Sequence, residues 1–243
     1  MLWGPKPVLE GLDICESLLA RGDVTVVIRV QAGQVRSLLA AMNGDVQVAR
    51  SSAAAAIALT EEFGLGLERA LASIDIGYGF ALLGDLDAAE RELRLGHEAL
   101  VAMGETGTRA SLGPELANVL QRRGRDAEAM TFAQESRAIA GDDDLDAQTR
   151  WRAAMARIVS AGGDHAEAER LAREAVDIVA STDFLPLQAD ALDALGEVLA
   201  RAGRVEEALD AVQRAIVLHE QKGNVVSAGR SRAVLNELRA RPS

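Results

Sequence analysis

The 243-residue sequence contains few of the residues on which many enzymes and small secreted domains depend. Its single cysteine, Cys15, excludes an internal disulfide and a cysteine-based zinc site. Aromatic residues make up 3% of the chain, whereas 49% of the chain is hydrophobic, so alanine and leucine must supply most of the core. This composition favours close helix–helix packing over a β-sandwich or an enzyme core with aromatic walls.

Lysine is also scarce, because only Lys6 and Lys222 accompany 24 arginines. Arginine is suited to pairing with carboxylates through its planar guanidinium group. The net charge of −11 argues against a nucleic-acid-binding face, which needs a basic stripe. No stretch approaches the roughly 18 apolar residues of a membrane span. The start has no basic segment followed by an apolar run, so we expect no signal peptide and a soluble, cytoplasmic protein.

A glycine turn followed by an alanine-rich amphipathic segment recurs five times, at Gly44, Gly84, Gly124, Gly163 and Gly203. The intervals are 40, 40, 39 and 40 residues, a period typical of a stacked repeat. Glycine reaches the left-handed conformation that ends many helices without a Cβ penalty. An aspartate directly after the glycine can cap the next helix. The chain is therefore predicted to be a series of helical hairpins.

Three columns of small residues share this register. They lie seven positions before each turn glycine, five positions after it and twelve positions after it. Small side chains at these places permit close approach of neighbouring helices, and a bulky one would overpack the contact by about 1–3 kcal/mol. The columns are Ser37, Gly77, Ala117, Ala156 and Gly196; Ala49, Ala89, Ala129, Ala168 and Ala208; and Ala56, Gly96, Ser136, Ala175 and Ala215.

This pattern resembles the tetratricopeptide repeat (TPR); HEAT-type repeats have a similar length, but the aligned small residues favour the TPR. The resemblance implies an all-α, right-handed superhelical solenoid of about five antiparallel hairpins with ~40-residue repeats. We expect one domain over residues 1–243. Thr25–Ile28 is β-branched, yet the repeat register predicts a helix there. Gly113-Pro114 predicts that its helix begins late or kinks. The expected hairpins are 24–61, 66–103, 108–140, 144–181 and 185–221, with an extra helix at 7–21 and a capping helix at 225–240. The capping helix is expected to turn its arginines, among them Arg230, to solvent.

The sequence offers no clear catalytic or metal-binding motif. The acidic run at residues 142–146 lacks the glycine and glutamate of a calcium loop, so it is interpreted as a capped helix start. His97, His165 and His219 have no second histidine or cysteine at metal-ligand spacing. Neither a complete dinucleotide fingerprint nor a phosphate loop is present. We therefore expect a non-enzymatic protein without a metal or cofactor.

A concave groove is the better candidate for function. In a TPR stack the first helix of each hairpin lines this groove, and its outward positions run from apolar (Leu38, Met42) through basic to acidic. Such a gradient can orient an extended peptide or a protein domain. The alternatives are charges that only solvate an exposed face, or a small-molecule site around Tyr78 and Arg122. The predicted groove residues are Tyr78, Asn118, Gln121, Arg122, Arg150, Arg157, Asp193 and Glu197.

Several motifs carry a closer resemblance: residues 2–7, 143–148 with Trp151-Arg152, 166–176, 182–185 and 222–225. Together they resemble the C-terminal repeat region of large bacterial signalling proteins. Those proteins join a class III cyclase or DNA-binding domain to an AAA/STAND-type ATPase and then to TPRs. The resemblance implies a sensor, scaffold or autoinhibitory arm that binds a protein or peptide. It implies no catalytic residue, because the cyclase metal carboxylates and the phosphate loop are missing.

The resemblance also implies that this chain is a detached or truncated C-terminal arm, or a piece of a longer protein, because the segment at residues 2–7 lies inside a longer array in the relatives. The helix at 7–21 would then lack a covering partner and leave an apolar end face. Exposed contiguous apolar surface commonly binds a partner. We therefore expect a homodimer through the N-terminal end as one possible assembly.

Overall fold

The computed structural model describes residues 4–240, which form twelve α-helices and no strand. Leu2 and Trp3 of the N-terminal motif lie outside the described residues. The outer limits of each hairpin lie within two residues of the expected ones. The helices are α1 Val8–Ala20, α2 Val26–Asn43, α3 Val46–Glu62, α4 Gly66–Leu82, α5 Leu86–Met103, α6 Gly107–Arg122, α7 Asp126–Ile139, α8 Leu145–Ala161, α9 His165–Val179, α10 Leu185–Arg201, α11 Val205–Lys222 and α12 Val225–Arg239.

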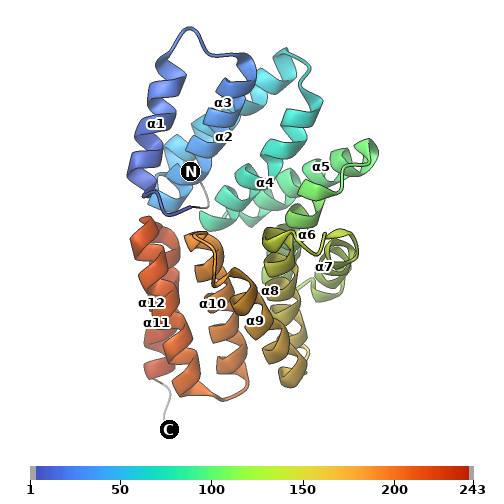
Figure 1. Ribbon diagram of the computed structural model, residues 1–243, viewed down its shortest axis with the longest axis vertical. Helices are drawn as coiled ribbons and strands as arrows, with labels where there is room; N and C mark the ends of the chain where they lie inside the picture. The colour runs from blue at the N-terminus through green and yellow to red at the C-terminus, as the bar shows by residue number, and fades with distance from the viewer. Residues whose placement is uncertain (1–3, 241–243) are drawn as a thin grey trace.

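The helices form antiparallel hairpins that stack side by side into a TPR-like solenoid (Figure 1). Within each hairpin the two helices pack along their length, as α2 does with α3 and α4 with α5. The first helices of successive hairpins, α2, α4, α6, α8 and α10, also pack against one another and form the inner layer. Residues 26–28 of the β-branched segment are helical as predicted, and Thr25 caps the helix, because its hydroxyl accepts the Ile28 N–H.

The five predicted turn glycines all adopt the left-handed conformation, with φ between 74° and 93°. Three of them precede an aspartate whose carboxylate accepts a backbone N–H three residues on and caps the second helix of its hairpin. These caps are Asp45, Asp85 and Asp164. The second half of the acidic run behaves in the same way, because Asp144 accepts the N–H of Ala147 at 3.0 Å and caps α8.

All fifteen residues of the three small-residue columns are buried, so the predicted packing seams are confirmed. The space at the glycines is closed by the facing helix. A Cβ at Gly77 would lie 2.5 Å from Cγ of Leu93, and a Cβ at Gly196 would lie 2.6 Å from Cγ2 of Val212. The small residues therefore set how closely the hairpin helices approach.

Replacing Gly196 by alanine is expected to destabilise the protein by about 1–3 kcal/mol, because the new methyl group collides with the stiff Val212 side chain. Gly229 is the matched control, since it lies in the exposed part of α12 with no atom within 4 Å of an added Cβ. Gly229→Ala is expected to stabilise the helix by up to about 1 kcal/mol. Urea denaturation measures both changes in the free energy of unfolding. Equal effects of the two substitutions would contradict the close helix packing at Gly196.

The prediction that the helix with Pro114 begins late is wrong, because α6 runs from Gly107 to Arg122 with Pro114 inside it. Proline has no N–H to donate to the carbonyl four residues earlier, which here belongs to Ala110. That carbonyl accepts a hydrogen bond from the buried Ser136 hydroxyl of α7 instead. A side chain from the second helix of the hairpin thus satisfies the carbonyl that the proline leaves free.

The two ends of the solenoid meet. In Figure 1 the lower ends of the N-terminal helices lie just above the upper ends of α11 and α12, and α12 contacts α2. The buried Lys222 ammonium donates to the carbonyl oxygens of Gly4 and Lys6 at 2.9 and 2.7 Å. Val226 of α12 packs on the apolar cluster of the first hairpin. The solenoid is therefore closed across these contacts.

The apolar residues of α2 that were expected to line the groove lie instead in the core. Leu38 and Met42, which were predicted to face the groove, are fully buried in a cluster with Val8 and Cys15 of α1. The prediction was wrong because the same cluster also contains Tyr78 and Leu82 of α4, and Val226 of α12 packs against it. Of the large apolar side chains on α1, Leu9 is the exposed one. No helix within residues 4–240 is long and apolar enough to cross a membrane.

Candidate functional site

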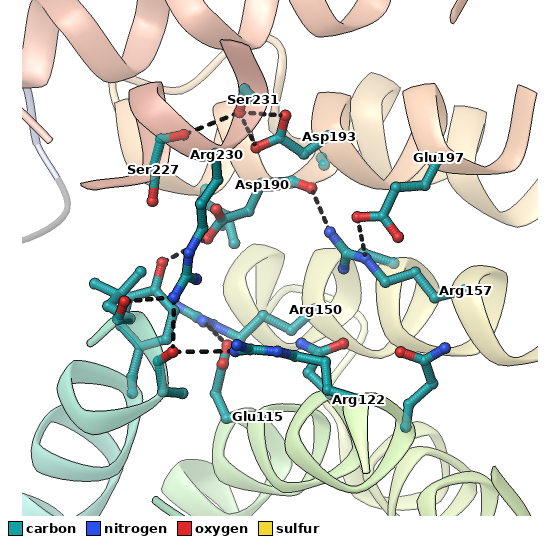
Figure 2. A pocket seen from close by; sticks show the side chains of 18 of the residues that line it. Glu115, Arg122, Arg150, Arg157, Asp190, Asp193, Glu197, Ser227, Arg230 and Ser231 are labelled. Atoms are coloured by element: carbon teal, nitrogen blue, oxygen red, sulfur yellow. Dashed lines mark hydrogen bonds and ion pairs between the residues drawn. The ribbon is translucent and has the colours of Figure 1, made fainter. Parts of the chain in front are cut away.

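The inner helices enclose a cavity of about 330 Å³ near the centre of the molecule (Figure 2). It is lined from α4, α6, α8 and α10, and α12 covers it from the far end of the chain. All eight residues that the sequence predicted for the groove line this one cavity. They are Tyr78, Asn118, Gln121, Arg122, Arg150, Arg157, Asp193 and Glu197.

Arg150 lies at the base of the cavity and is only 4% exposed. Its guanidinium donates to Asp146, at 2.8 Å from Nε, and to the buried carboxylate of Glu115. Burial alone would lower the pKa of Arg150, but the carboxylates of Asp146 and Glu115 raise it. Ser111 donates to Asp146 at 2.6 Å and helps to hold that acid in place. The interpretation of Arg150 as a solvated surface charge is therefore wrong.

A second charged pair joins α8 to α10. Arg157 donates from Nε to Glu197 at 3.2 Å and from a terminal nitrogen to the carbonyl oxygen of Asp190 at 3.3 Å. The Tyr78 hydroxyl donates to the Asp190 carboxylate at 3.0 Å, across the cavity from α4. The expected gradient from basic to acidic is thus replaced by pairs of opposite charge, which form between neighbouring inner helices or within one of them.

Arg122 and Arg230 are held differently from the other arginines of the cavity. Arg122 donates to the carbonyl oxygen of Ala81 at 3.0 Å, and Arg230 donates to the same oxygen at 3.1 Å and to that of Leu82. No ion pair joins either of them to a carboxylate within residues 4–240. Burial and then the nearby positive charge of Arg230 lower the pKa of Arg122.

Among the charged residues that line the cavity, sequence reasoning missed Arg230 and Glu115. Arg230 was predicted only as part of a solvent-facing capping helix, and Glu115 was not considered. No signal in the sequence places Arg230 beside Ala81, because the two residues are 149 positions apart. For Glu115, the inner-helix register that identified Asn118 also places it on the lining face of α6.

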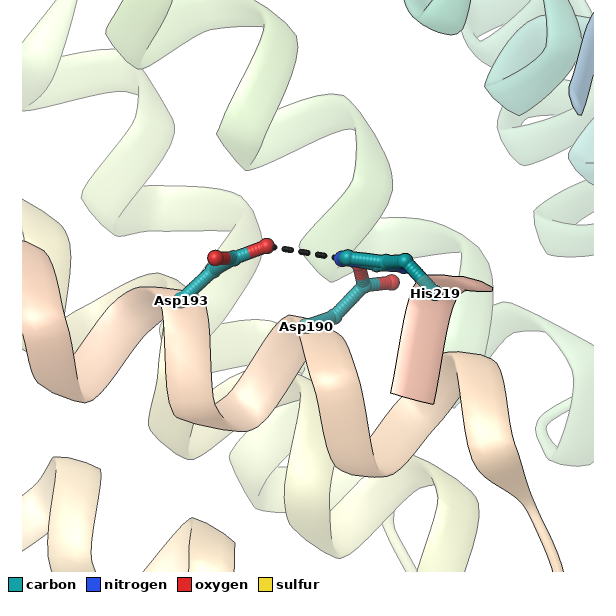
Figure 3. Close-up of side chains that lie close together, drawn as sticks. All are labelled: Asp190, Asp193 and His219. Carbon is teal, nitrogen blue, oxygen red and sulfur yellow. Dashed lines mark hydrogen bonds and ion pairs between the residues drawn. The ribbon is translucent and has the colours of Figure 1, made fainter. Parts of the chain in front are cut away.

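The cavity wall also carries a compact group of three possible metal ligands, Asp190, Asp193 and His219 (Figure 3). One ligand atom from each lies within 4.8 Å of the others. Here Nε2 of the buried His219 is 2.9 Å from the Asp193 carboxylate, which also accepts a hydrogen bond from Ser231 at 2.8 Å. The search for metal ligands at short sequence spacing did not find this group, because Asp190 and Asp193 lie on α10 and His219 lies on α11. Asp190 accepts its hydrogen bond from Tyr78, and within residues 4–240 Nδ1 of His219 has no hydrogen-bond partner.

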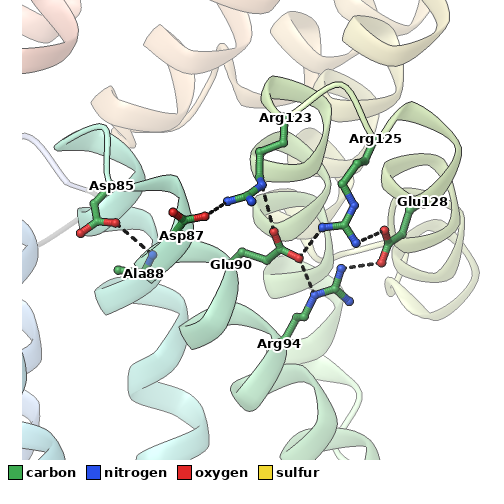
Figure 4. A network of polar contacts seen from close by, with 8 residues as sticks. All are labelled: Asp85, Asp87, Ala88, Glu90, Arg94, Arg123, Arg125 and Glu128. Carbon is green, nitrogen blue, oxygen red and sulfur yellow. Dashed lines mark hydrogen bonds and ion pairs between the residues drawn. The ribbon is translucent and has the colours of Figure 1, made fainter.

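A further charged network lies outside the cavity, between successive hairpins (Figure 4). Glu90 receives hydrogen bonds from Arg94 at 2.8 Å and Arg125 at 2.7 Å. The same pairing recurs along the stack, between the sixth residue after one turn glycine and the first residue after the next. This repetition indicates a structural role. The pairs are Arg50 with Asp85, Glu90 with Arg125 and Glu169 with Arg204.

Comparisons with known proteins agree with this fold. Residues 155–221 match the family model described as tetratricopeptide repeat. NprR in complex with its cognate peptide NprX is similar, with a TM-score of 0.66 and 14% identity over 95% of this chain and 65% of that chain. BtubC from P. vanneervenii has a TM-score of 0.59 and 17% identity over 97% of this chain and 92% of its own.

A third similar structure contains the TPR-like repeats of a putative kinesin light chain from Podosopora anserina. Its TM-score is 0.52, with 19% identity over 78% of this chain and 94% of that chain. A search of curated proteins finds no match. At these identities the likeness establishes the fold, which is that of a TPR-like α-solenoid.

Proposed function

We propose that the protein is a non-catalytic interaction scaffold or sensor arm that binds a peptide, or a segment of a protein, in the central cavity. The observation that carries this proposal is that all eight residues predicted for recognition line one cavity. Their polar groups are not all used internally, because the amide of Asn118 makes no hydrogen bond within residues 4–240. The similar fold of NprR, which was crystallised with a peptide, supports this use of the fold.

The cavity also favours a second candidate, a small-molecule effector. Its volume of about 330 Å³ lies near the lower end of the range for ligand sites. Tyr78, Leu82 and Leu187 give it apolar walls beside the charged groups. A small molecule or the end of a peptide fits this space better than a folded domain does.

The proposal for the biological context of the protein rests on the sequence resemblance alone. We propose, on that basis, a regulatory arm of a cytoplasmic bacterial signalling or transcription-regulating protein. A homodimer through α1 stays a prediction. Light scattering at high micromolar concentration tests it, and a monomeric mass would contradict it.

Filling the cavity tests the proposed function. A displayed library of random peptides is selected on the wild-type protein, and the affinities of the selected peptides are then measured for Asn118→Trp. We expect at least about a tenfold loss, because the indole occupies the space and the Asn118 amide is removed. Ala161→Trp is the matched control, since Ala161 is exposed at the end of α8, away from the cavity lining.

Circular dichroism establishes that both tryptophan variants fold. Peptides that bind Asn118→Trp as tightly as the wild type would contradict the cavity as the binding site. If no peptide is selected but a metabolite screen finds a compound that raises the melting temperature of the wild type and not of Asn118→Trp, the small-molecule function replaces the peptide one.

A further inference from the structure

We propose that Arg122 and Arg230 together form a binding site for an anionic oxygen group, a carboxylate or a phosphate, on the molecule that occupies the cavity. This inference rests on the proposed function, because it names the chemical group that the occupant presents. It joins a residue of the third hairpin to one of the last helix, so the site exists only in the closed solenoid.

The two guanidinium groups converge on one point. Arg122 and Arg230 both donate to the carbonyl oxygen of Ala81, at 3.0 and 3.1 Å, and Figure 2 shows both side chains extending into the cavity. Ala81 and Leu82 are the last residues of α4, where the carbonyls carry the partial negative charge of the helix end, and the Ala81 carbonyl also accepts the Gly84 N–H at 3.2 Å. This charge positions the arginines without neutralising them.

Each of the other cavity arginines already has a carboxylate. Arg150 is neutralised by Glu115 and Asp146, and Arg157 by Glu197. Arg122 and Arg230 have only the carbonyls, although both are exposed and therefore reachable from the cavity. Burial and the positive charges of Arg230 and Arg157 lower the pKa of Arg122, and Glu197 only partly opposes them. Two adjacent cations of this kind favour the arrival of an anion.

The guanidinium group matches such an anion in geometry as well as in charge. It presents several N–H donors in a plane and forms paired hydrogen bonds with carboxylates and phosphates. The carbonyl contacts occupy one terminal nitrogen of each arginine, NH1 of Arg122 and NH2 of Arg230. The remaining N–H groups are available to a ligand, and the amide of Gln121 lines the cavity next to Arg122.

Titration calorimetry with inorganic phosphate and with citrate tests the site. We expect saturable binding of at least one probe to the wild-type protein, weakened at least about tenfold in Arg122→Gln and in Arg230→Gln. Raising the salt concentration should weaken it further. Arg232→Gln is the matched control, because Arg232 lies on α12 but pairs with Glu220 on the exposed surface. It should bind like the wild type.

The two probes separate the possible sources of the anion, since preference for phosphate indicates a phosphorylated ligand and preference for citrate indicates a carboxylate. No saturable binding of either probe, or equal affinities for all four proteins, would overturn the proposal. Circular dichroism and the melting temperature exclude unfolding, and Arg122→Gln is the safer variant because it removes a single carbonyl contact.

The selected peptides distinguish failure of this inference from failure of the proposed function. If peptides depend on Asn118 but contain no excess of acidic residues and bind Arg122→Gln normally, the cavity is a binding site and the anion site is wrong. If acidic peptides lose at least about tenfold in affinity in both arginine variants, and not in Arg232→Gln, both proposals stand.

Discussion

Replacing Arg150 by methionine is expected to destabilise the protein by about 3–5 kcal/mol, the largest effect of any single substitution considered. Arg150 is buried between Glu115 and Asp146 and neutralises both. Its loss leaves two acids in a poorly solvated site without a counter-charge. Urea denaturation at neutral pH measures the change in the free energy of unfolding.

A double variant shows whether the cost comes from the uncompensated acids rather than from lost packing. Arg150→Met combined with Glu115→Gln removes one charge of each sign, and is expected to be clearly more stable than Arg150→Met alone. If Arg150→Met costs less than about 1 kcal/mol, or if Glu115→Gln makes it worse, the buried network is not arranged as described.

Asp75 is expected to make stability depend on pH. It lies buried on α4, where desolvation raises its pKa to about 6, against the attraction of Arg150 and a hydrogen bond from Gln34. The folded protein therefore binds a proton on Asp75 more tightly than the unfolded chain does. This contribution to stability is present at low pH and is lost as the pH rises towards about 6.

Asp75→Asn removes this dependence, because the amide stays neutral and its oxygen can still accept from Gln34. The stability of the variant relative to wild type should rise by about 2 kcal/mol between pH 4 and pH 7.5. Denaturation curves of both proteins at several pH values measure the difference, in which titrations of the other groups largely cancel. A difference that does not change with pH would contradict the burial of an ionisable Asp75.

Much of the fold could be predicted because the repeat depends on interactions between residues that are close in the sequence. The turn glycines and the small-residue columns each follow from a backbone conformation or a helix contact within one hairpin or between neighbours. The lining of the cavity followed as well, since the inner face of a helix is fixed once its register is known. For that reason residues as far apart as Tyr78 and Glu197 were assigned to one surface.

The closure of the solenoid could not be predicted, because it depends on small rotations between hairpins that accumulate along the stack. The contacts that reveal it join residues more than a hundred positions apart, such as Tyr78 with Asp190 and Lys222 with Gly4. The error on Arg230 has this origin, because Arg230 was predicted to face solvent but lies beside Ala81 of α4. The charge pairs that replace the expected gradient were missed for another reason, because they depend on side-chain contacts between neighbouring helices.

The distance between the two ends of the chain tests the central claim most directly, because the cavity exists only if they meet. Spin labels at Leu9→Cys and Val225→Cys, in a Cys15→Ala background, occupy two exposed positions beside the contact of α1 with the segment before α12. The account predicts a single short distance between the labels in solution. A broad distribution extending to long distances would show an open solenoid, in which Arg122 and Arg230 do not share a site.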